Sequence, residues 1–171
     1  LRMLQQACLS TATITSMVFT LLLGAAVFSI VFRILGGEDL VHALLSSLPG
    51  GTMGALISVM LVMFLLGFVL DTFEVIFIII PITAPVLLGM DVDPIWLGVL
   101  VGINLQTSFM TPPFGFSLIY LRGVAPASVT TGMIYRGAVP FVALQLIGLG
   151  IVMAFPELST WLPAQVFRNG G

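Results

Sequence analysis

The sequence predicts an all-α protein that crosses a membrane several times. Hydrophobic residues make up 59% of its 171 positions, charged residues only 7%, and the mean hydropathy is +1.23. A water-soluble domain carries charge on about a quarter of its residues. The polar side chains of this chain are too few to cover a surface exposed to water, so lipid is the expected solvent.

Composition also excludes several kinds of site and partner. The single cysteine, Cys8, excludes an internal disulfide framework, and the single histidine, His42, excludes a histidine-rich metal site. The chain has no lysine and no basic run, so nucleic acid is not an expected partner. Leu1 is not an initiator residue, and we expect the chain to be part of a longer subunit.

The first fifty residues predict a membrane-spanning helix followed by a helix at the membrane surface. Residues 11–35 are an apolar run longer than the about 20 residues that cross the hydrocarbon core, and Gly36-Gly37 ends it. Residues 38–49 place their apolar side chains on one helical face. This pattern predicts an amphipathic helix that lies in the interface.

The next two apolar runs predict a hairpin with a polar tip. Residues 52–70 and 75–90 flank the acidic residues Asp71 and Glu74, which share a face if this segment is helical. Two prolines are expected to break the second run twice. Ionisable side chains at membrane depth usually line a pathway or bind an ion. An aqueous loop between two spans is the alternative, and the pattern favours a functional hairpin tip.

Residues 95–121 predict a helix that is broken in mid-membrane. Pro112 and Pro113 remove two consecutive N–H donors, and Gly115 permits backbone angles that other residues resist. Non-helical backbone at this depth survives only against protein or a water-filled cavity. A kink that serves packing alone is the alternative, but the double proline favours a functional break.

A polar stripe leads into the break. Its four members recur at the i, i+3, i+4, i+7 spacing of one helical face and are Asn104, Thr107, Ser108 and Thr111. Gly98 and Gly102 are expected to let another backbone approach this helix closely. Free carbonyls and hydroxyls around the break are oxygen ligands that suit a hard cation. The half-helix after the break presents its positive end, which suits an anionic group.

The rest of the chain predicts a polar connector, residues 122–136, and a last span, residues 137–155, with an interfacial tail. If Arg2 is cytoplasmic, then Arg122 and Arg136 are cytoplasmic too, and most acidic residues lie outside. The positive-inside rule favours this orientation.

Four segments form a combination that is more specific than any one motif. They are Leu66-Gly67-Phe68-Val69-Leu70-Asp71, Pro81-Ile82-Thr83-Ala84-Pro85, Asp93-Pro94-Ile95-Trp96-Leu97-Gly98-Val99-Leu100, and Asn104 through Thr111-Pro112-Pro113-Phe114-Gly115. Together they resemble the large membrane subunit of tripartite ATP-independent periplasmic (TRAP) transporters, the DctM-like M protein. The resemblance covers essentially the whole chain. It implies an elevator-type transporter built from two inverted repeats, of which this chain is the C-terminal one.

The resemblance also implies a domain organisation. Residues 1–50 would be a scaffold transmembrane helix plus an interfacial helix. Residues 51–136 would be the re-entrant hairpin and discontinuous helix of the transport domain, and residues 137–171 the last transmembrane helix and tail. The implied activity is sodium-coupled import of an organic acid across the bacterial inner membrane, with sodium as coupling ion and no other cofactor. The implied partners are a periplasmic substrate-binding protein, a small Q-type membrane subunit and the N-terminal half of the same subunit.

The resemblance further implies which residues bind. The expected sodium ligands are Gly67, Asp71, Ser108, Thr111 and Pro112. The expected substrate contacts are Asn104, Thr107, Pro113 and Gly115. Glu74 is a further polar side chain expected at membrane depth. The alternative function is a structural or assembly subunit without a substrate pathway, and an enzyme is not expected.

Overall fold

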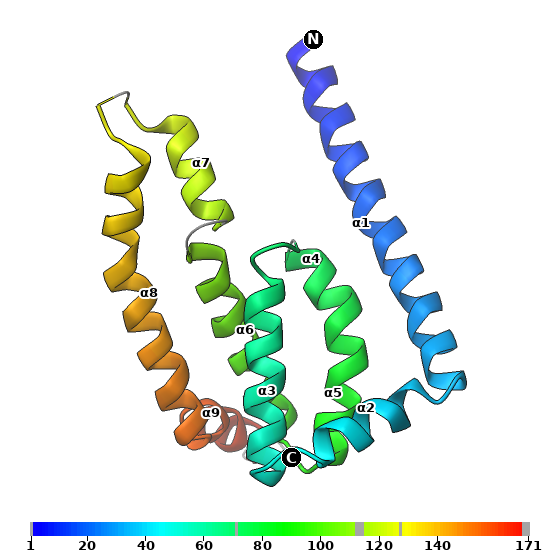
Figure 1. Cartoon of the computed structure of the whole chain (residues 1–171). Helices are drawn as coiled ribbons and strands as arrows, with labels where there is room; N and C mark the ends of the chain where they lie inside the picture. Colours follow the sequence, from blue (N-terminus) through cyan, green and yellow to red (C-terminus); the bar gives the residue numbers. More distant parts are fainter. Residues whose placement is uncertain (1, 71, 112–114, 127, 169–171) are drawn as a thin grey trace.

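The computed structural model describes residues 2–70, 72–111, 115–126 and 128–168, and these residues form helices joined by short turns (Figure 1). In chain order the helices are α1 (Arg2–Ile34), α2 (Gly37–Ser46), α3 (Gly51–Leu66), α4 (Thr72–Glu74), the π-helical turn η1 (Val75–Ile79), α5 (Ile80–Gly89), α6 (Pro94–Met110), α7 (Phe116–Val124), α8 (Thr131–Ala154) and α9 (Glu157–Arg168). The described residues contain no strand, and the all-α prediction is confirmed.

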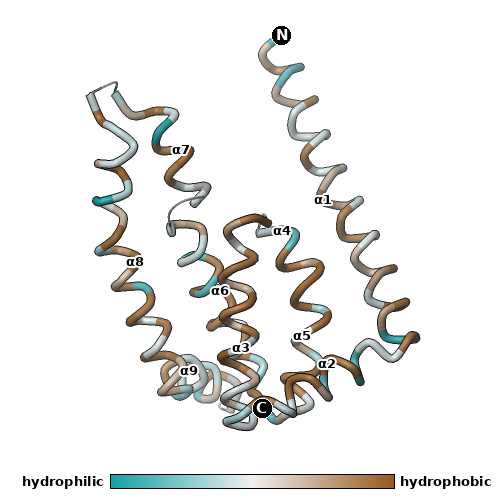
Figure 2. Tube along the Cα trace, viewed as in Figure 1, coloured by the Kyte–Doolittle hydropathy of each residue, from teal (hydrophilic) through white to brown (hydrophobic). Residues whose placement is uncertain are grey.

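Several of these helices are long and apolar enough to cross a membrane. Within the described part of the chain they are α1, the segment Thr72–Gly89 and α8, and a fourth is added if α2 and α3, bent by 113°, count as one span. The hydropathy of the trace shows the same apolar helices with polar residues mainly near their ends (Figure 2). The prediction of a polytopic membrane protein is confirmed.

The corner between α1 and α2 is built from a glycine and an ion pair. Gly36 has a φ of 76°, which a residue with a side chain rarely adopts. Arg33 Nε lies 2.9 Å from Glu38 Oε1 across this corner. Helix α2 then runs across the end of α1 (Figure 1), with Leu45 buried and Leu40 exposed. An amphipathic helix therefore forms where the sequence predicts one, and α1 begins earlier than the predicted span, at Arg2.

Helix α3 and the segment α4–η1–α5 lie antiparallel and form the predicted hairpin (Figure 1). The 16 residues of α3 rise about 24 Å, which is less than the roughly 30 Å of the hydrocarbon core. The Thr52 hydroxyl donates to the Met90 carbonyl at 3.2 Å and joins the two arms at their base. The first arm is therefore short for a full span, whereas the second arm, Thr72–Gly89, is long enough to cross.

The prediction that two prolines break the second arm is wrong. Pro81 and Pro85 both lie within α5, and helical structure is continuous from Thr72 to Gly89. The turn before Pro81 has π-helical register, and the Ile80 N–H donates to the Val75 carbonyl five residues back. The helix then continues through both prolines without a break.

Helix α6 starts at a cap that the sequence specifies. The Asp93 carboxylate accepts from the N–H groups of Ile95 and Trp96 at 2.8 and 2.9 Å, and Pro94 occupies the first helical position. The Trp96 indole donates to the Val152 carbonyl of α8 at 2.8 Å. This carbonyl has no helical donor four residues on, because Pro156 lacks an N–H.

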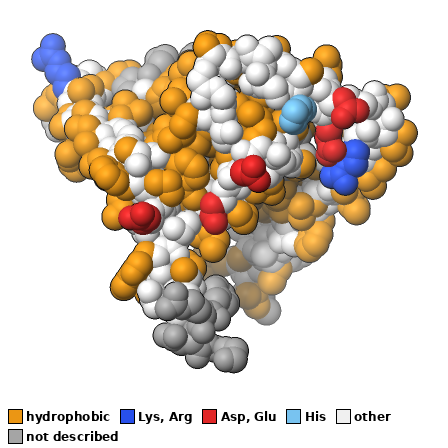
Figure 3. Space-filling model, turned by 90° about the horizontal axis from the view of Figure 1, so that it is seen from below, with side chains coloured by type: hydrophobic (Ala, Val, Ile, Leu, Met, Phe, Trp, Pro, Cys, Tyr) orange, Lys and Arg blue, Asp and Glu red, His pale blue; other side chains and the backbone are white. Residues whose placement is uncertain are grey.

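The connector between α7 and α8 is shorter than predicted. Helix α7 continues to Val124 and α8 begins at Thr131, so only residues 125–130 connect them. Arg122 and Arg136 consequently lie on helices. The start of α1 and this connector lie at one end of the molecule (Figure 1). Acidic side chains gather on the opposite face, where α2, the turn before α6 and α9 meet (Figure 3).

The main core lies between the hairpin and α6. Its buried apolar side chains come chiefly from α3, α5 and α6, and include Leu56, Met63, Leu87 and Leu100. A smaller cluster of Leu118, Ile134 and Ala138 joins α7 to α8. No residue of α1 is buried. The hairpin, α6 and α8 thus form one packed body, and this body positions the residues of the candidate functional site.

Candidate functional site

The tip of the hairpin and the break between α6 and α7 lie at a similar level, part way along α1 and α8 (Figure 1). Helix α6 ends at Met110, Thr111 is extended with φ −88° and ψ 126°, and α7 begins at Phe116. The predicted discontinuous helix is therefore observed. The predicted site residues Asp71, Pro112 and Pro113 lie outside the described residues.

The hairpin tip touches α6 one turn before the break. A Cβ placed at Gly67 would lie 2.3 Å from Ser108 Oγ and 2.9 Å from Ser108 Cβ, so a side chain does not fit there. Gly67 follows the last residue of α3, where the helix dipole is negative and where the Leu65 and Leu66 carbonyls accept hydrogen bonds from the turn that follows. The structure thus brings together two of the predicted sodium ligands.

The polar stripe of α6 faces the first arm of the hairpin. Asn104, Thr107 and Ser108 are each at most 1% exposed. The Asn104 amide donates to the Met60 carbonyl of α3 at 2.9 Å. The hydroxyls of Thr107 and Ser108 donate to carbonyls of the preceding turn at 2.7 and 3.0 Å. The stripe therefore shares one face, as predicted, and roles in binding substrate or sodium stay predictions.

Oxygen atoms are concentrated at the break itself. The Thr111 hydroxyl donates to the Thr107 carbonyl at 2.7 Å, and the Gly115 N–H donates to the Thr111 carbonyl at 3.1 Å. A Cβ at Gly115 would lie 2.9 Å from the Phe109 carbonyl oxygen and 3.0 Å from that of Thr111. Glycine is needed here because the chain folds back closely on the carbonyls that end α6.

Glu74 lines a cavity of about 310 Å³ between the second arm of the hairpin and α1, together with Thr20, Gly24 and Phe77. None of the described residues of the break lines this cavity. A role of Glu74 at membrane depth stays a prediction.

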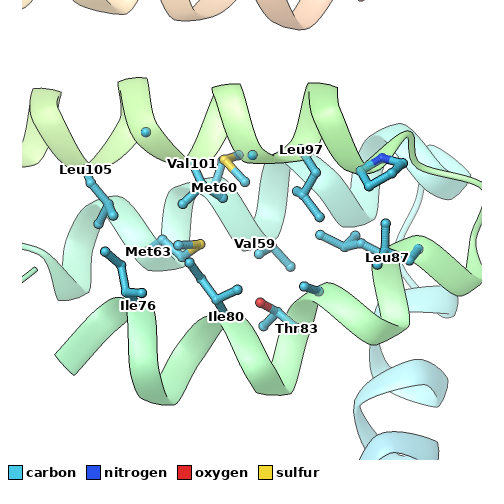
Figure 4. A pocket seen from close by; sticks show the side chains of 15 residues that line it. Val59, Met60, Met63, Ile76, Ile80, Thr83, Leu87, Leu97, Val101 and Leu105 are labelled. Carbon is cyan, nitrogen blue, oxygen red and sulfur yellow. The ribbon is translucent and has the colours of Figure 1, made fainter. Parts of the chain in front are cut away.

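Gly98 and Gly102 do not have the role that the sequence predicts. Within the described part of the chain, nothing lies within 4 Å of a Cβ placed at either glycine. Both border an apolar cavity of about 370 Å³ between the hairpin and α6 (Figure 4). The hydroxyl of Thr83 in its lining is satisfied by the Ile79 carbonyl at 2.9 Å, which leaves a space with little polar character.

Three polar residues near the break are missed by the sequence reasoning. Gln106 and Ser117 line a different cavity of about 550 Å³ at the end of α6. Gln145 of α8 places Nε2 3.5 Å from Met110 Sδ, and its buried Oε1 has no hydrogen-bond partner in the described structure. Gln145 is a lone amide in an apolar run, which was an available signal, whereas Gln106 lies among the polar residues of the stripe but off its face.

Comparison with known proteins gives one family. The chain matches the model of the DctM component of the tripartite ATP-independent periplasmic transporter over residues 1–158. It is 32% identical over 113 residues to the C4-dicarboxylate TRAP transporter large permease protein DctM of Vibrio cholerae, covering 66% of this chain and 24% of that protein. It is 27% identical over 161 residues to the ectoine/5-hydroxyectoine TRAP transporter large permease protein UehC of Ruegeria pomeroyi, covering 94% and 37%. It is 29% identical over 98 residues to the sialic acid TRAP transporter permease protein SiaT of Haemophilus influenzae, covering 57% and 16%.

The chain therefore spans between 16% and 37% of the length of these three relatives. No solved structure matches it. The matched residues 1–158 include the hairpin, the broken helix and all of α8. The chain belongs to the DctM family of large TRAP transporter permeases.

Proposed function

We propose that this chain forms the C-terminal repeat of a sodium-coupled TRAP transporter that imports an organic acid across the bacterial inner membrane. The contact between Gly67 at the hairpin tip and Ser108 beside the break carries the proposal. Two elements that end within the bilayer meet there, and non-helical backbone at that depth needs to face protein, water or an ion rather than lipid.

Sodium is the ion that this arrangement suits. The negative end of α3 lies against the Ser108 side chain, and the Thr111 hydroxyl follows Ser108 within one turn of α6. Hard cations bind oxygen ligands of this kind. The fold further supports an elevator motion, in which the packed body of hairpin, α6 and α8 would move past α1, because no residue of α1 is buried against it.

The family supports the partners and the direction of transport. The relatives' names are those of permeases for dicarboxylates, ectoine and sialic acid, which supports transport rather than catalysis, and an organic substrate. A periplasmic binding protein, a small Q-type subunit and the N-terminal half of this subunit would complete the transporter. The end that carries Arg2, Arg122 and Arg136 would be cytoplasmic.

The decisive experiment is uptake by the complete transporter in proteoliposomes under an inward sodium gradient. Thr111→Val removes a hydroxyl oxygen at the break and keeps the shape of the side chain. We expect sodium-driven uptake to fall at least tenfold, which corresponds to about 1.4 kcal/mol. Thr111→Ser keeps the hydroxyl and serves as the matched control that retains uptake.

Two outcomes would contradict the proposal. Uptake that ignores the sodium gradient, or that requires ATP, excludes the coupling. Full uptake by Thr111→Val and also by Asp71→Ala, in protein that inserts normally, would favour a structural subunit without a substrate pathway.

A further inference from the structure

A second polar surface of α6 faces a cavity that the buried stripe does not reach. The cavity has a volume of about 550 Å³ and lies between the start of α4, the end of α6 and the first turn of α7. Its polar lining consists of Thr72, Gln106 and Ser117. Binding sites for small molecules commonly measure about 300–1,000 Å³. The volume therefore suits a small organic ligand.

Gln106 and its neighbour Thr107 have opposite surroundings. Thr107 is 0% exposed and hydrogen-bonded inside the packed body, whereas Gln106 is exposed. Among the described residues, neither the Gln106 amide nor the Ser117 hydroxyl has a hydrogen-bond partner. An amide that faced hydrocarbon at this depth without a partner would be strongly disfavoured. Its side of α6 must therefore meet water, ligand or another part of the transporter.

The lining specifies the chemistry of the ligand group. The described residues of the lining include no acidic, basic or histidine side chain, so they offer no charge to pair with a carboxylate. A carboxamide and a hydroxyl both donate and accept hydrogen bonds, as an alcohol group does. Ile76 and Leu105 supply apolar walls for a carbon skeleton.

We infer that this cavity binds the uncharged, hydroxyl-bearing part of the transported organic acid, with Gln106 and Ser117 as direct contacts. The inference rests on the proposed transport function. It means that the ligand contacts the face of α6 opposite the buried stripe. The acid's carboxylate is then bound elsewhere in the transporter.

Cysteine labelling of the complete transporter tests whether the cavity is open to water. In a Cys8→Ser background, Gln106→Cys and Ser117→Cys should react with the charged thiol reagent sulfonatoethyl methanethiosulfonate. Thr107→Cys is the matched control, because it lies at the same depth on the buried face and should stay unmodified. Equal reactivity at 106 and 107, or none at both 106 and 117, would overturn the inference.

Protection from labelling tests the chemistry of the ligand. Two pairs of acids with and without hydroxyls serve as probes, namely malate with succinate and gluconate with hexanoate. At least one hydroxylated acid should protect Ser117→Cys, which keeps the Gln106 amide, at a concentration about tenfold or more below that of its partner, because the deoxy acid leaves that amide unpaired. The cavity assignment is contradicted if none of the acids protects the cysteine, or if both members of each pair protect it equally well.

Uptake of the protecting acid separates this inference from the proposed function. If the acid protects the cysteine from labelling but its uptake does not depend on the sodium gradient, the proposed coupling is wrong and the cavity assignment stands. If sodium-driven uptake is observed for an acid that never protects Ser117→Cys, the coupling stands and the cavity assignment is wrong.

Discussion

Gly67 is required for space rather than for conformation. Its φ of −64° is ordinary for any residue, so backbone freedom does not explain the glycine. The explanation is the Ser108 side chain, which occupies the volume that a Cβ would fill. At this position only the Ser108 side chain separates the backbone of the hairpin tip from that of α6.

We predict that Gly67→Ala separates the tip from α6. Overpacking of this kind costs about 1–3 kcal/mol, and the half-saturating sodium concentration of uptake should rise as well. Thermal unfolding of the purified transporter and sodium titration of uptake measure the two effects. Gly24→Ala is the matched control, because nothing lies within 4 Å of its added Cβ. An unchanged melting temperature for Gly67→Ala would contradict the close approach.

Asn104 offers a test of packing against binding. Its amide donates to the Met60 carbonyl, and hydrogen bonds between helices in membranes contribute roughly 0.6–1.7 kcal/mol. We predict that Asn104→Leu lowers stability by about this amount. If Asn104 is also a substrate contact, the KM of uptake rises as well. A lowered melting temperature with an unchanged KM would assign Asn104 to packing alone.

At the scale of the element, the apolar runs predicted correctly where the helices form. The prolines were a poorer guide to where the helices end. The two arms of the hairpin and both halves of the broken helix follow from residues 52–121. Pro81 was misleading because the helix continues through it after a π-helical turn, and Pro85 is accommodated within α5. A single sequence does not show whether a missing donor is replaced locally, since this depends on the register of the preceding turn.

The contact between α6 and α8 gives a prediction at the same scale. Trp96→Phe removes the only indole N–H available to the Val152 carbonyl in the described structure, and we expect a loss of roughly 0.6–1.7 kcal/mol. Pro156→Ala restores a backbone N–H four residues after Val152 and should partly rescue the variant. Thermal unfolding of the two single variants and the double variant measures the coupling. Additive effects would show that this carbonyl does not link the two positions.

At the scale of the whole molecule, the sequence predicts the face shared by the buried stripe but not what covers it. Helical spacing joins Asn104, Thr107 and Ser108, whereas only the packed structure shows the hairpin arm against them. Gln106 has no periodic partner of its own, and its significance comes from a cavity formed by three elements. Sites that several distant segments build together cannot be completed from spacing along one helix.

The orientation of the molecule can be measured directly. In a Cys8→Ser background, Ser128→Cys marks the end with Arg122 and Arg136, and Ser47→Cys marks the acidic end; both serines are exposed. The positive-inside rule predicts that a membrane-impermeant maleimide labels position 47 on spheroplasts, and position 128 only after lysis. The reverse pattern would invert the proposed direction of the hairpin.

The hydrogen bond between Trp96 and Val152 also gives the protein an optical property. The sequence contains two tryptophans, and Trp96 is 8% exposed whereas Trp161 is 63% exposed. A buried indole emits at shorter wavelength than one in contact with water. In a transporter whose other tryptophans, including Trp161, are replaced by phenylalanine, the emission wavelength of Trp96 would report the contact between α6 and α8. Any rearrangement of that contact during transport would then be visible without an added dye.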